Sequence, residues 1–250
     1  MSGTFALISG GGTAGHVQPG LDIARALLDQ GYAIDELHYV GSERGIETTL
    51  VPEAGLELTV LPGRGIARKL TLANVGAVWG LLRAFVSAFR LVRERRPKVI
   101  VSLGGYASVP CALWGVLLRV PIVVAEQNAV PGLANRLVGR YATAAAVSFP
   151  NVDLPNAVWT GNPVRESIRA VDRVGGRAEA RKHLDVPEHK LLVSVFGGSL
   201  GARRINHAVT AAVARWADRD DLVVRHIVGQ RDFADVKRAN PLADTDPLDN

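Results

Sequence analysis

The sequence predicts an α/β fold built from two successive Rossmann-like domains with parallel sheets, the second of them incomplete. Three observations lead to this prediction. Short apolar runs alternate with helix-period segments, which is typical of parallel strands joined by crossover helices. A strand followed by a glycine turn and a helix begins at Ala6 and again at Val193, so the pattern starts twice. The length also fits, because 250 residues, 48% of them hydrophobic, can bury a sizeable core.

Six short apolar runs are the expected strands of the first domain. They are Phe5–Ile8, Leu37–Val40, Leu56–Leu61, Val99–Ser102, Ile122–Ala125 and Ala144–Ser148. Amphipathic stretches lie between most of them, and we expect these to be helices packed on the faces of the sheet.

A passage rich in glycine, proline and arginine, Thr160 to Gly176, separates the two domains. We place the boundary after residue 160, so that 1–160 form the first domain and 161–250 a partial second one. Only two strand candidates follow, Leu192–Phe196 and Val223–Val228. Two parallel strands cannot support a sheet that is covered on both faces. The second domain is therefore expected to be truncated, or completed by a missing C-terminal segment or a second chain.

The formal net charge of +5 and the pI near 9.7 predict an anionic partner. Basic residues between Arg64 and Arg96 are interleaved with apolar residues, most of them aliphatic, and not with the series of stacking aromatics expected of a nucleic-acid surface. An anionic membrane surface is therefore favoured, and nucleic acid is not expected. The single Cys111 excludes an internal disulfide and fits a cytosolic protein.

Glycine loops follow the first and the fourth strand candidates. Gly10-x-Gly12-x-x-Gly15 formally matches the dinucleotide fingerprint, in which backbone N–H groups approach a pyrophosphate. The tip of the second strand, Val40–Ser42, lacks the acidic residue that a NAD site needs, so a nicotinamide cofactor is a minor alternative, as is a turn that serves only packing. The second loop, Gly104–Ser108, offers another anion site, and two such sites suit a diphosphate. Tyr106 is equally compatible with an ordinary half-buried aromatic.

Three polar residues, Glu126, Gln127 and Asn128, stand at the carboxyl end of the fifth strand candidate. Ligands of parallel sheets bind at this edge, so the three residues favour a site. The alternative is that Asn128 caps the following helix.

Five motifs in this order closely resemble the MurG family of glycosyltransferases. They are Gly11–His16, Gly104–Ser108, Glu126–Asn128, Gly161–Arg165 and Gly197–Arg203. The resemblance implies a GT-B fold and an inverting enzyme without a metal or other cofactor. Such an enzyme transfers GlcNAc from UDP-GlcNAc to the C4 hydroxyl of the muramyl sugar in undecaprenyl-pyrophosphoryl-MurNAc-pentapeptide, and it would be peripheral at the cytoplasmic face of the cell membrane. Members of the family continue well beyond residue 250 and usually have Gly at Ala14 and Gln at Leu200.

The resemblance also implies roles for individual residues. His16 would be the catalytic base and Glu126 a second catalytic residue. The expected substrate contacts are Thr13, Ala14, Gly15, Gly104, Gly105, Tyr106, Ser108, Gln127, Asn128, Arg165, Gly198 and Ser199, with the two loops of the first domain at the acceptor pyrophosphate. A histidine at a helix N-terminus has its neutral form favoured, which suits a base. The alternatives are a helix-capping or acceptor-orienting His16 and a solvated linker charge at Arg165.

The helix-period segment from Thr71 to Arg96 combines apolar residues with arginines. Such a helix can lie on an anionic leaflet, although a helix buried against the sheet is also apolar. The resemblance favours a membrane contact made by Ile66, Leu70, Trp79, Arg83 and Phe85. Two other functions stay open: a non-catalytic module that binds the lipid-linked precursor, and a related GT-B enzyme with another acceptor.

Overall fold

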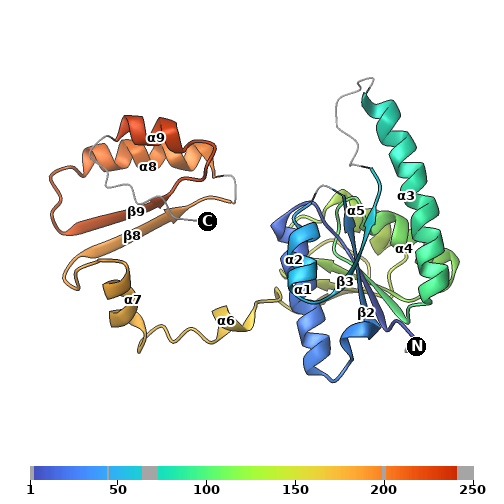
Figure 1. Cartoon of the computed structure of the whole chain (residues 1–250). Coiled ribbons are helices and arrows are strands. Elements are labelled where there is room, and N and C mark those ends of the chain that lie inside the picture. Colours follow the sequence, from blue (N-terminus) through green and yellow to red (C-terminus); the bar gives the residue numbers. More distant parts are fainter. Residues whose placement is uncertain (1–2, 44, 64–72, 199–200, 241–250) are drawn as a thin grey trace. The chain divides into compact units, whose positions relative to one another are not determined.

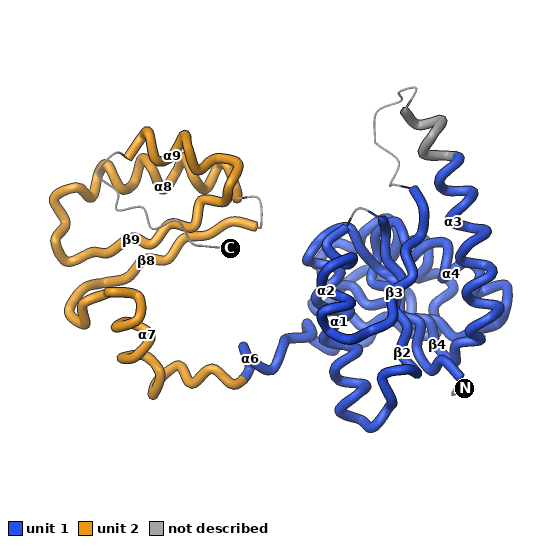
Figure 2. Tube along the Cα trace, in the orientation of Figure 1, with its two compact units in different colours: residues 1–169 blue, residues 170–250 orange. Residues whose placement is uncertain are grey.

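The computed structural model of the chain describes residues 3–43, 45–63, 73–198 and 201–240, without the side chains of 73–78. It divides into two compact units, residues 1–169 and 170–250 (Figure 2). The division falls at the end of α6, Glu166–Arg169, somewhat later than the boundary after residue 160 that we placed from the sequence. Each unit is described separately below.

The first unit contains a parallel sheet of seven strands in the order β3-β2-β1-β4-β5-β6-β7. All six runs predicted from the sequence form strands, and a short seventh strand was missed. Its three residues are all exposed, so it lacks the buried apolar run by which the other strands were found. The strands are β1 Ala6–Ser9, β2 Leu37–Ser42, β3 Glu57–Leu61, β4 Val99–Ser102, β5 Ile122–Glu126, β6 Ala144–Val147 and β7 Ala157–Trp159.

Helices cover both faces of this sheet (Figure 1). One core cluster contains side chains from α1 and α2, and the other contains side chains from α3, α4 and α5. The α1 residues Val17 and Ala24 and the α3 residues Ala84 and Ala88 are almost fully buried. The helical elements are α1 Ala14–Asp29, a 3-10 turn Ile34–Glu36, α2 Glu47–Glu53, α3 Ala73–Arg95, α4 Ser108–Leu117 and α5 Leu133–Gly139.

The strand order reverses at β1, which pairs with β2 on one side and β4 on the other. Ser9, the last residue of β1, is in register with Val40 of β2 and with Ser102 of β4. The connections that leave β1 and β4 therefore start side by side at the carboxyl edge of the sheet. In open α/β sheets this switch point is where ligands bind.

The second unit restarts the pattern with one parallel pair, β8 Leu191–Phe196 and β9 Leu222–Ile227. The helices α8 Arg203–Arg215 and α9 Phe233–Ala239 lie over the same face of this pair (Figure 1), and α7 Arg177–His183 precedes it. The two strands predicted for this part of the chain are confirmed, and within the described residues its sheet has these two strands alone.

Candidate active site

The two glycine loops of the first unit pack against each other at the switch point. Gly105 has φ +80°, and a Cβ on it would lie 2.7 Å from the carbonyl oxygen of Gly11. A Cβ on Gly10 would lie 2.6 Å from the Cβ of Leu103. These glycines are therefore needed for the close approach of the two backbones, whether or not a ligand is bound.

His16 lies in the first turn of α1, next to the contact between the two loops. Its Nδ1 is 3.1 Å from the hydroxyl oxygen of Thr13, and its Nε2 would be 3.3 Å from a Cβ on Gly104. If Nδ1 donates a hydrogen to Thr13, Nε2 carries the free lone pair and is the nitrogen that can accept a proton.

Burial lowers the pKa of His16 below its ordinary value, while the negative charges of Glu126 and Glu47 and a hydrogen bond to the Gly11 backbone raise it by a smaller amount. The imidazole is therefore mainly neutral near pH 7. A neutral imidazole at this position can take a proton from a hydroxyl group.

Glu126 ends β5 and is only 2% exposed. One carboxylate oxygen accepts hydrogen bonds from the backbone and side-chain nitrogens of Asn128, at 2.9 and 2.7 Å. The other accepts them from Gly132 N, at 2.9 Å, and from Asn135 Nδ2, at 3.0 Å. Burial by itself would raise the pKa of Glu126, but these hydrogen bonds outweigh it and hold the pKa below its ordinary value. The carboxylate thus holds the loop that carries Asn128, which favours a positioning role over the direct catalytic role we expected.

A pocket of about 340 Å³ opens beside His16. It lies within the first unit and brings together the start of α1, the polar end of β5 and the residues after β7. Its lining comprises Thr13, Ala14, Gly15, His16, Gln18, Pro19, Asp22, Gln127, Asn128, Asn162 and Pro163. The side-chain oxygen of Gln127 is buried without a hydrogen-bond partner among the described residues, so the side chain must turn before this oxygen can accept a bond from a ligand in the pocket.

Several other predicted substrate contacts have structural partners instead. The hydroxyl of Tyr106 donates to the carbonyl of Pro62 at 2.9 Å, and burial raises its pKa. The buried hydroxyl of Ser108 donates to the carbonyl of Gly105 at 3.1 Å, so it supports the second loop. Arg165 is exposed and does not line the pocket, whereas Asn162 of the same motif does.

Sequence reasoning missed two buried polar residues at this edge, Glu47 and Asn135. Glu47 is 0% exposed and lies among Gly11, Gly41 and Gly45, and this spacing of glycines around one acid was the available signal. Asn135 is 2% exposed on α5 and donates to both Ala125 O and Glu126. An asparagine on the buried side of a short helix marks such a contact, since buried amides need partners.

The helix α3 exposes part of its predicted membrane-facing surface. Trp79 is 65% exposed, Arg83 is exposed and Phe85 is partly buried, while Leu82 and Val86 add further exposed apolar area. The opposite side packs on the sheet and on α4, where Trp114 Nε1 donates to Phe85 O at 2.8 Å. One face of this helix is therefore buried against the protein and the other is exposed and partly apolar, and the contact with a membrane stays a prediction. Ile66 and Leu70 lie outside the described residues, and no helix in the described ranges is long and apolar enough to cross a membrane.

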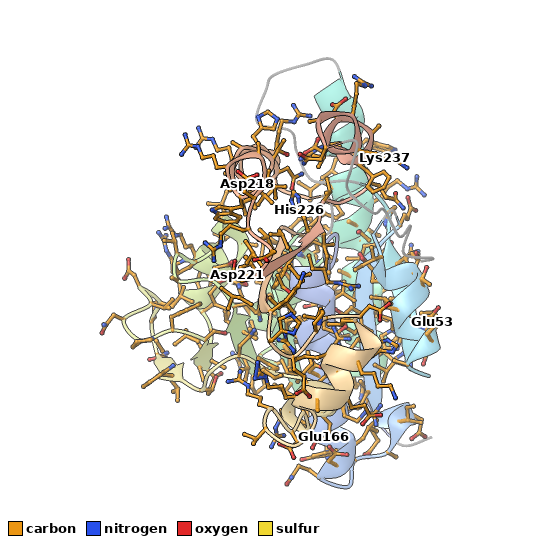
Figure 3. The ribbon with its side chains drawn as sticks, turned by 90° about the vertical axis from the view of Figure 1, so that its left-hand side faces the viewer. Glu53, Glu166, Asp218, Asp221, His226 and Lys237 are labelled. Atoms are coloured by element: carbon orange, nitrogen blue, oxygen red, sulfur yellow. The ribbon has the colours of Figure 1, made fainter. Side chains whose placement is uncertain are left out.

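In the second unit, Gly201 of the glycine loop after β8 lies beside a buried polar cluster. Asn206 of α8 donates to Val228 O at 3.0 Å and to Asp232 at 3.2 Å, and its side-chain oxygen lies 3.1 Å from Nε2 of His226, which Figure 3 labels on β9. Arg231 and Arg203 also reach Asp232 and lower its pKa. Gly198 of this loop is exposed, as a ligand contact would require, and Ser199 lies outside the described residues.

Comparison with known proteins decides the family. The model of the glycosyltransferase family 28 N-terminal domain matches residues 6–147, which is more than half of the chain, and that of the family 28 C-terminal domain matches residues 192–248. The chain belongs to glycosyltransferase family 28. The match confirms the two-domain α/β class and the GT-B type predicted from the sequence.

Two relatives are both named UDP-N-acetylglucosamine–N-acetylmuramyl-(pentapeptide) pyrophosphoryl-undecaprenol N-acetylglucosamine transferase. The protein from Streptomyces coelicolor is 40% identical over 90% of this chain, and that from Nocardia farcinica is 41% identical over 94%. The chain spans 61% and 63% of the lengths of these two relatives. The predicted resemblance to the MurG family is thus confirmed, over a chain that covers about three-fifths of such relatives.

Solved structures agree. The crystal structure of Acinetobacter baumannii MurG superposes with a TM-score of 0.67 at 26% identity, covering 95% of this chain and 64% of that one. A UDP-GlcNAc 2-epimerase from Neisseria meningitidis, bound to UDP-GlcNAc, has a TM-score of 0.62 at 7% identity, covering 99% of this chain and 73% of that one. The second likeness shows a shared fold alone.

Proposed function

We propose that this chain acts in the transfer of GlcNAc from UDP-GlcNAc to the C4 hydroxyl of the muramyl sugar in undecaprenyl-pyrophosphoryl-MurNAc-pentapeptide. The observation that carries the proposal is His16, a neutral imidazole whose Nε2 faces the second glycine loop at the edge of a polar pocket. The names of the relatives supply the two substrates.

In this mechanism, Nε2 of His16 takes the proton of the acceptor C4 hydroxyl as its oxygen attacks the anomeric carbon of GlcNAc. The bond between that carbon and the β-phosphate oxygen breaks, and UDP leaves with the electron pair. The carboxylates of Glu126 and Glu47 favour the imidazolium that forms. Glu126 also holds Asn128 at the pocket, where Thr13, Ala14 and Gly15 are the other proposed donor contacts. Arg165, Gly198 and Ser199 remain proposed contacts of UDP.

The acceptor is tested with a matched pair of substrates. The full chain is incubated with labelled UDP-GlcNAc and either a lipid-linked muramyl-pentapeptide analogue or its 4-deoxy counterpart. We expect a GlcNAc-linked product from the first and none from the second. Transfer to the 4-deoxy analogue would contradict attack by this hydroxyl. Absence of product from the folded chain would contradict catalysis by these residues and favour a module that only binds the precursor.

The exposed face of α3 supports a peripheral location on an anionic membrane, at the cytoplasmic face where the proposed reaction takes place. Trp79, Leu82 and Val86 can enter the headgroup region while Arg83 and Arg90 pair with phosphates. Sedimentation with vesicles that contain anionic lipid should recover the chain, and Trp79→Glu with Val86→Glu should reduce the recovery. Trp216→Glu, in the second unit, is the control. Equal recovery of all three proteins would refute this part of the proposal.

A further inference from the structure

The first glycine loop already contains a negative charge supplied by the chain itself. Glu47 is the first residue of α2, and its side chain is 0% exposed. Its carboxylate turns back toward the end of β2 and toward the loop after β1. It accepts hydrogen bonds from Ser42 N and Ser42 Oγ, both at 2.7 Å, and from Gly12 N at 3.0 and 3.1 Å to its two oxygens.

Glycines make the room for this carboxylate. A Cβ on Gly11, Gly41 or Gly45 would overlap the side chain of Glu47. These three glycines come from three different segments, the first loop, β2 and the turn before α2. The glycine content of this region is therefore explained by an internal acid, without any ligand.

The chemistry of the contact is that of a bound phosphate. In nucleotide-binding folds, the loop between the first strand and its helix uses backbone N–H groups to hold an anion. Here the N–H of Gly12 is directed at a carboxylate instead. Burial by itself would raise the pKa of Glu47, but the hydrogen bonds from Ser42 and Gly12 outweigh it and lower the pKa, so the group stays ionised at neutral pH.

We propose that Glu47 is the resident anion of the first glycine loop: it occupies the position of a ligand phosphate and fixes the loop that carries His16. Phosphate groups of substrates are then excluded from Gly11 and Gly12 and bind elsewhere on the protein. On this proposal the N–H of Gly12 is not free for the acceptor pyrophosphate that we expected at both loops, while Thr13, Ala14 and Gly15 still line the pocket. The proposal also argues against the dinucleotide mode of binding, because the Gly12 N–H that would approach a pyrophosphate already donates to Glu47. The inference does not depend on the proposed transfer reaction.

Chemical rescue tests the proposal. Glu47→Ala removes the carboxylate and leaves a space that formate or inorganic phosphate can enter. We expect 100 mM formate, roughly tenfold above a weak site's Kd, to raise the melting temperature of the folded variant by about 3 °C or more relative to chloride at equal ionic strength. The wild type should shift by less than about 1 °C under the same conditions. Equal shifts in both proteins, or no shift in the folded variant, would overturn the proposal.

Glu47→Gln provides a second test, because it keeps the size of the side chain and removes the charge. NMR of the full chain should show a large change at the Gly12 amide, and the ring of His16 should titrate at a lower pH than in the wild type, since one of the two carboxylates that raise its pKa is gone. Glu53→Gln on the same helix, an exposed residue labelled in Figure 3, is the control and should change neither signal. In the wild type, inorganic pyrophosphate should not shift the NMR signal of the Gly12 amide. A shift of that amide by pyrophosphate would show an open anion site and overturn the proposal.

Discussion

Replacing Glu126 by Gln should destabilise the first unit, because its carboxylate accepts four hydrogen bonds from within the chain. The amide has one acceptor oxygen, so two of the four donors lose their partner. Hydrogen bonds to charged groups contribute about 1.5–3 kcal/mol each, and a buried donor left unpaired costs a similar amount. Asn128 and Gly132 are exposed and can bond to water, whereas Asn135 is 2% exposed and cannot. We therefore expect the free energy of unfolding to fall by about 2–4 kcal/mol.

The effect should depend on pH in a defined direction. The pKa of Glu126 is lowered in the folded state, so its stabilisation is fully present above the ordinary glutamate pKa of about 4.3 and is lost as the pH falls through the lower folded-state value. The difference between wild type and variant should be largest at pH 7 and should shrink below about pH 4.

The assay is urea denaturation, with unfolding monitored by hydrogen exchange in peptides that span β5. The second unit then does not contribute to the signal. Glu53→Gln is the control, because this exposed carboxylate lies on α2, away from β5. A Glu126→Gln protein as stable as the wild type at pH 7, or a difference that stays constant down to pH 3, would refute the reasoning.

Three further predictions follow from the loops. Gly105→Ala should lower the melting temperature more than Gly31→Ala, since both glycines have positive φ but a Cβ meets backbone only at Gly105; equal losses would contradict the packing of the two loops. Gly201→Ala should destabilise the second unit alone, because its Cβ would overlap the carbonyl of Val228. Hydrogen exchange measured separately for each unit checks this, and a loss of protection in the first unit would contradict it. The ring of His16 should titrate below its ordinary pKa of 6.5 in NMR spectra, and a midpoint above that value would show that burial does not dominate.

Much of the fold follows from local patterns. The buried strands are apolar runs, and the first-unit strands β1, β2 and β4 are almost fully buried, so periodicity locates them within a residue or two. The strand β7 escapes this reasoning because it is exposed at the edge of the sheet and is held by pairing with β6.

The site was predicted less completely, for a physical reason. Motifs indicate which residues stand at the ends of strands, and the folded chain brings three of these, His16, Gln127 and Asn128, to one pocket. They do not tell whether a polar group faces a ligand or another part of the chain. The partners of Glu126 and Glu47 come from several segments, and their convergence depends on the path of the folded backbone.

The measurement that most directly tests the central claim is the rate of GlcNAc transfer from UDP-GlcNAc to a lipid-linked muramyl-pentapeptide, as a function of pH, in the wild type and in His16→Ala. General-base catalysis contributes about 10²–10⁴-fold, and we expect the variant to lose that much rate while binding UDP-GlcNAc with unchanged affinity. The wild-type rate should decline at acidic pH as His16 becomes protonated. The residual rate of His16→Ala should not show this decline. A variant with the wild-type rate, or with the same acidic decline, would show that His16 does not take the proton of the acceptor.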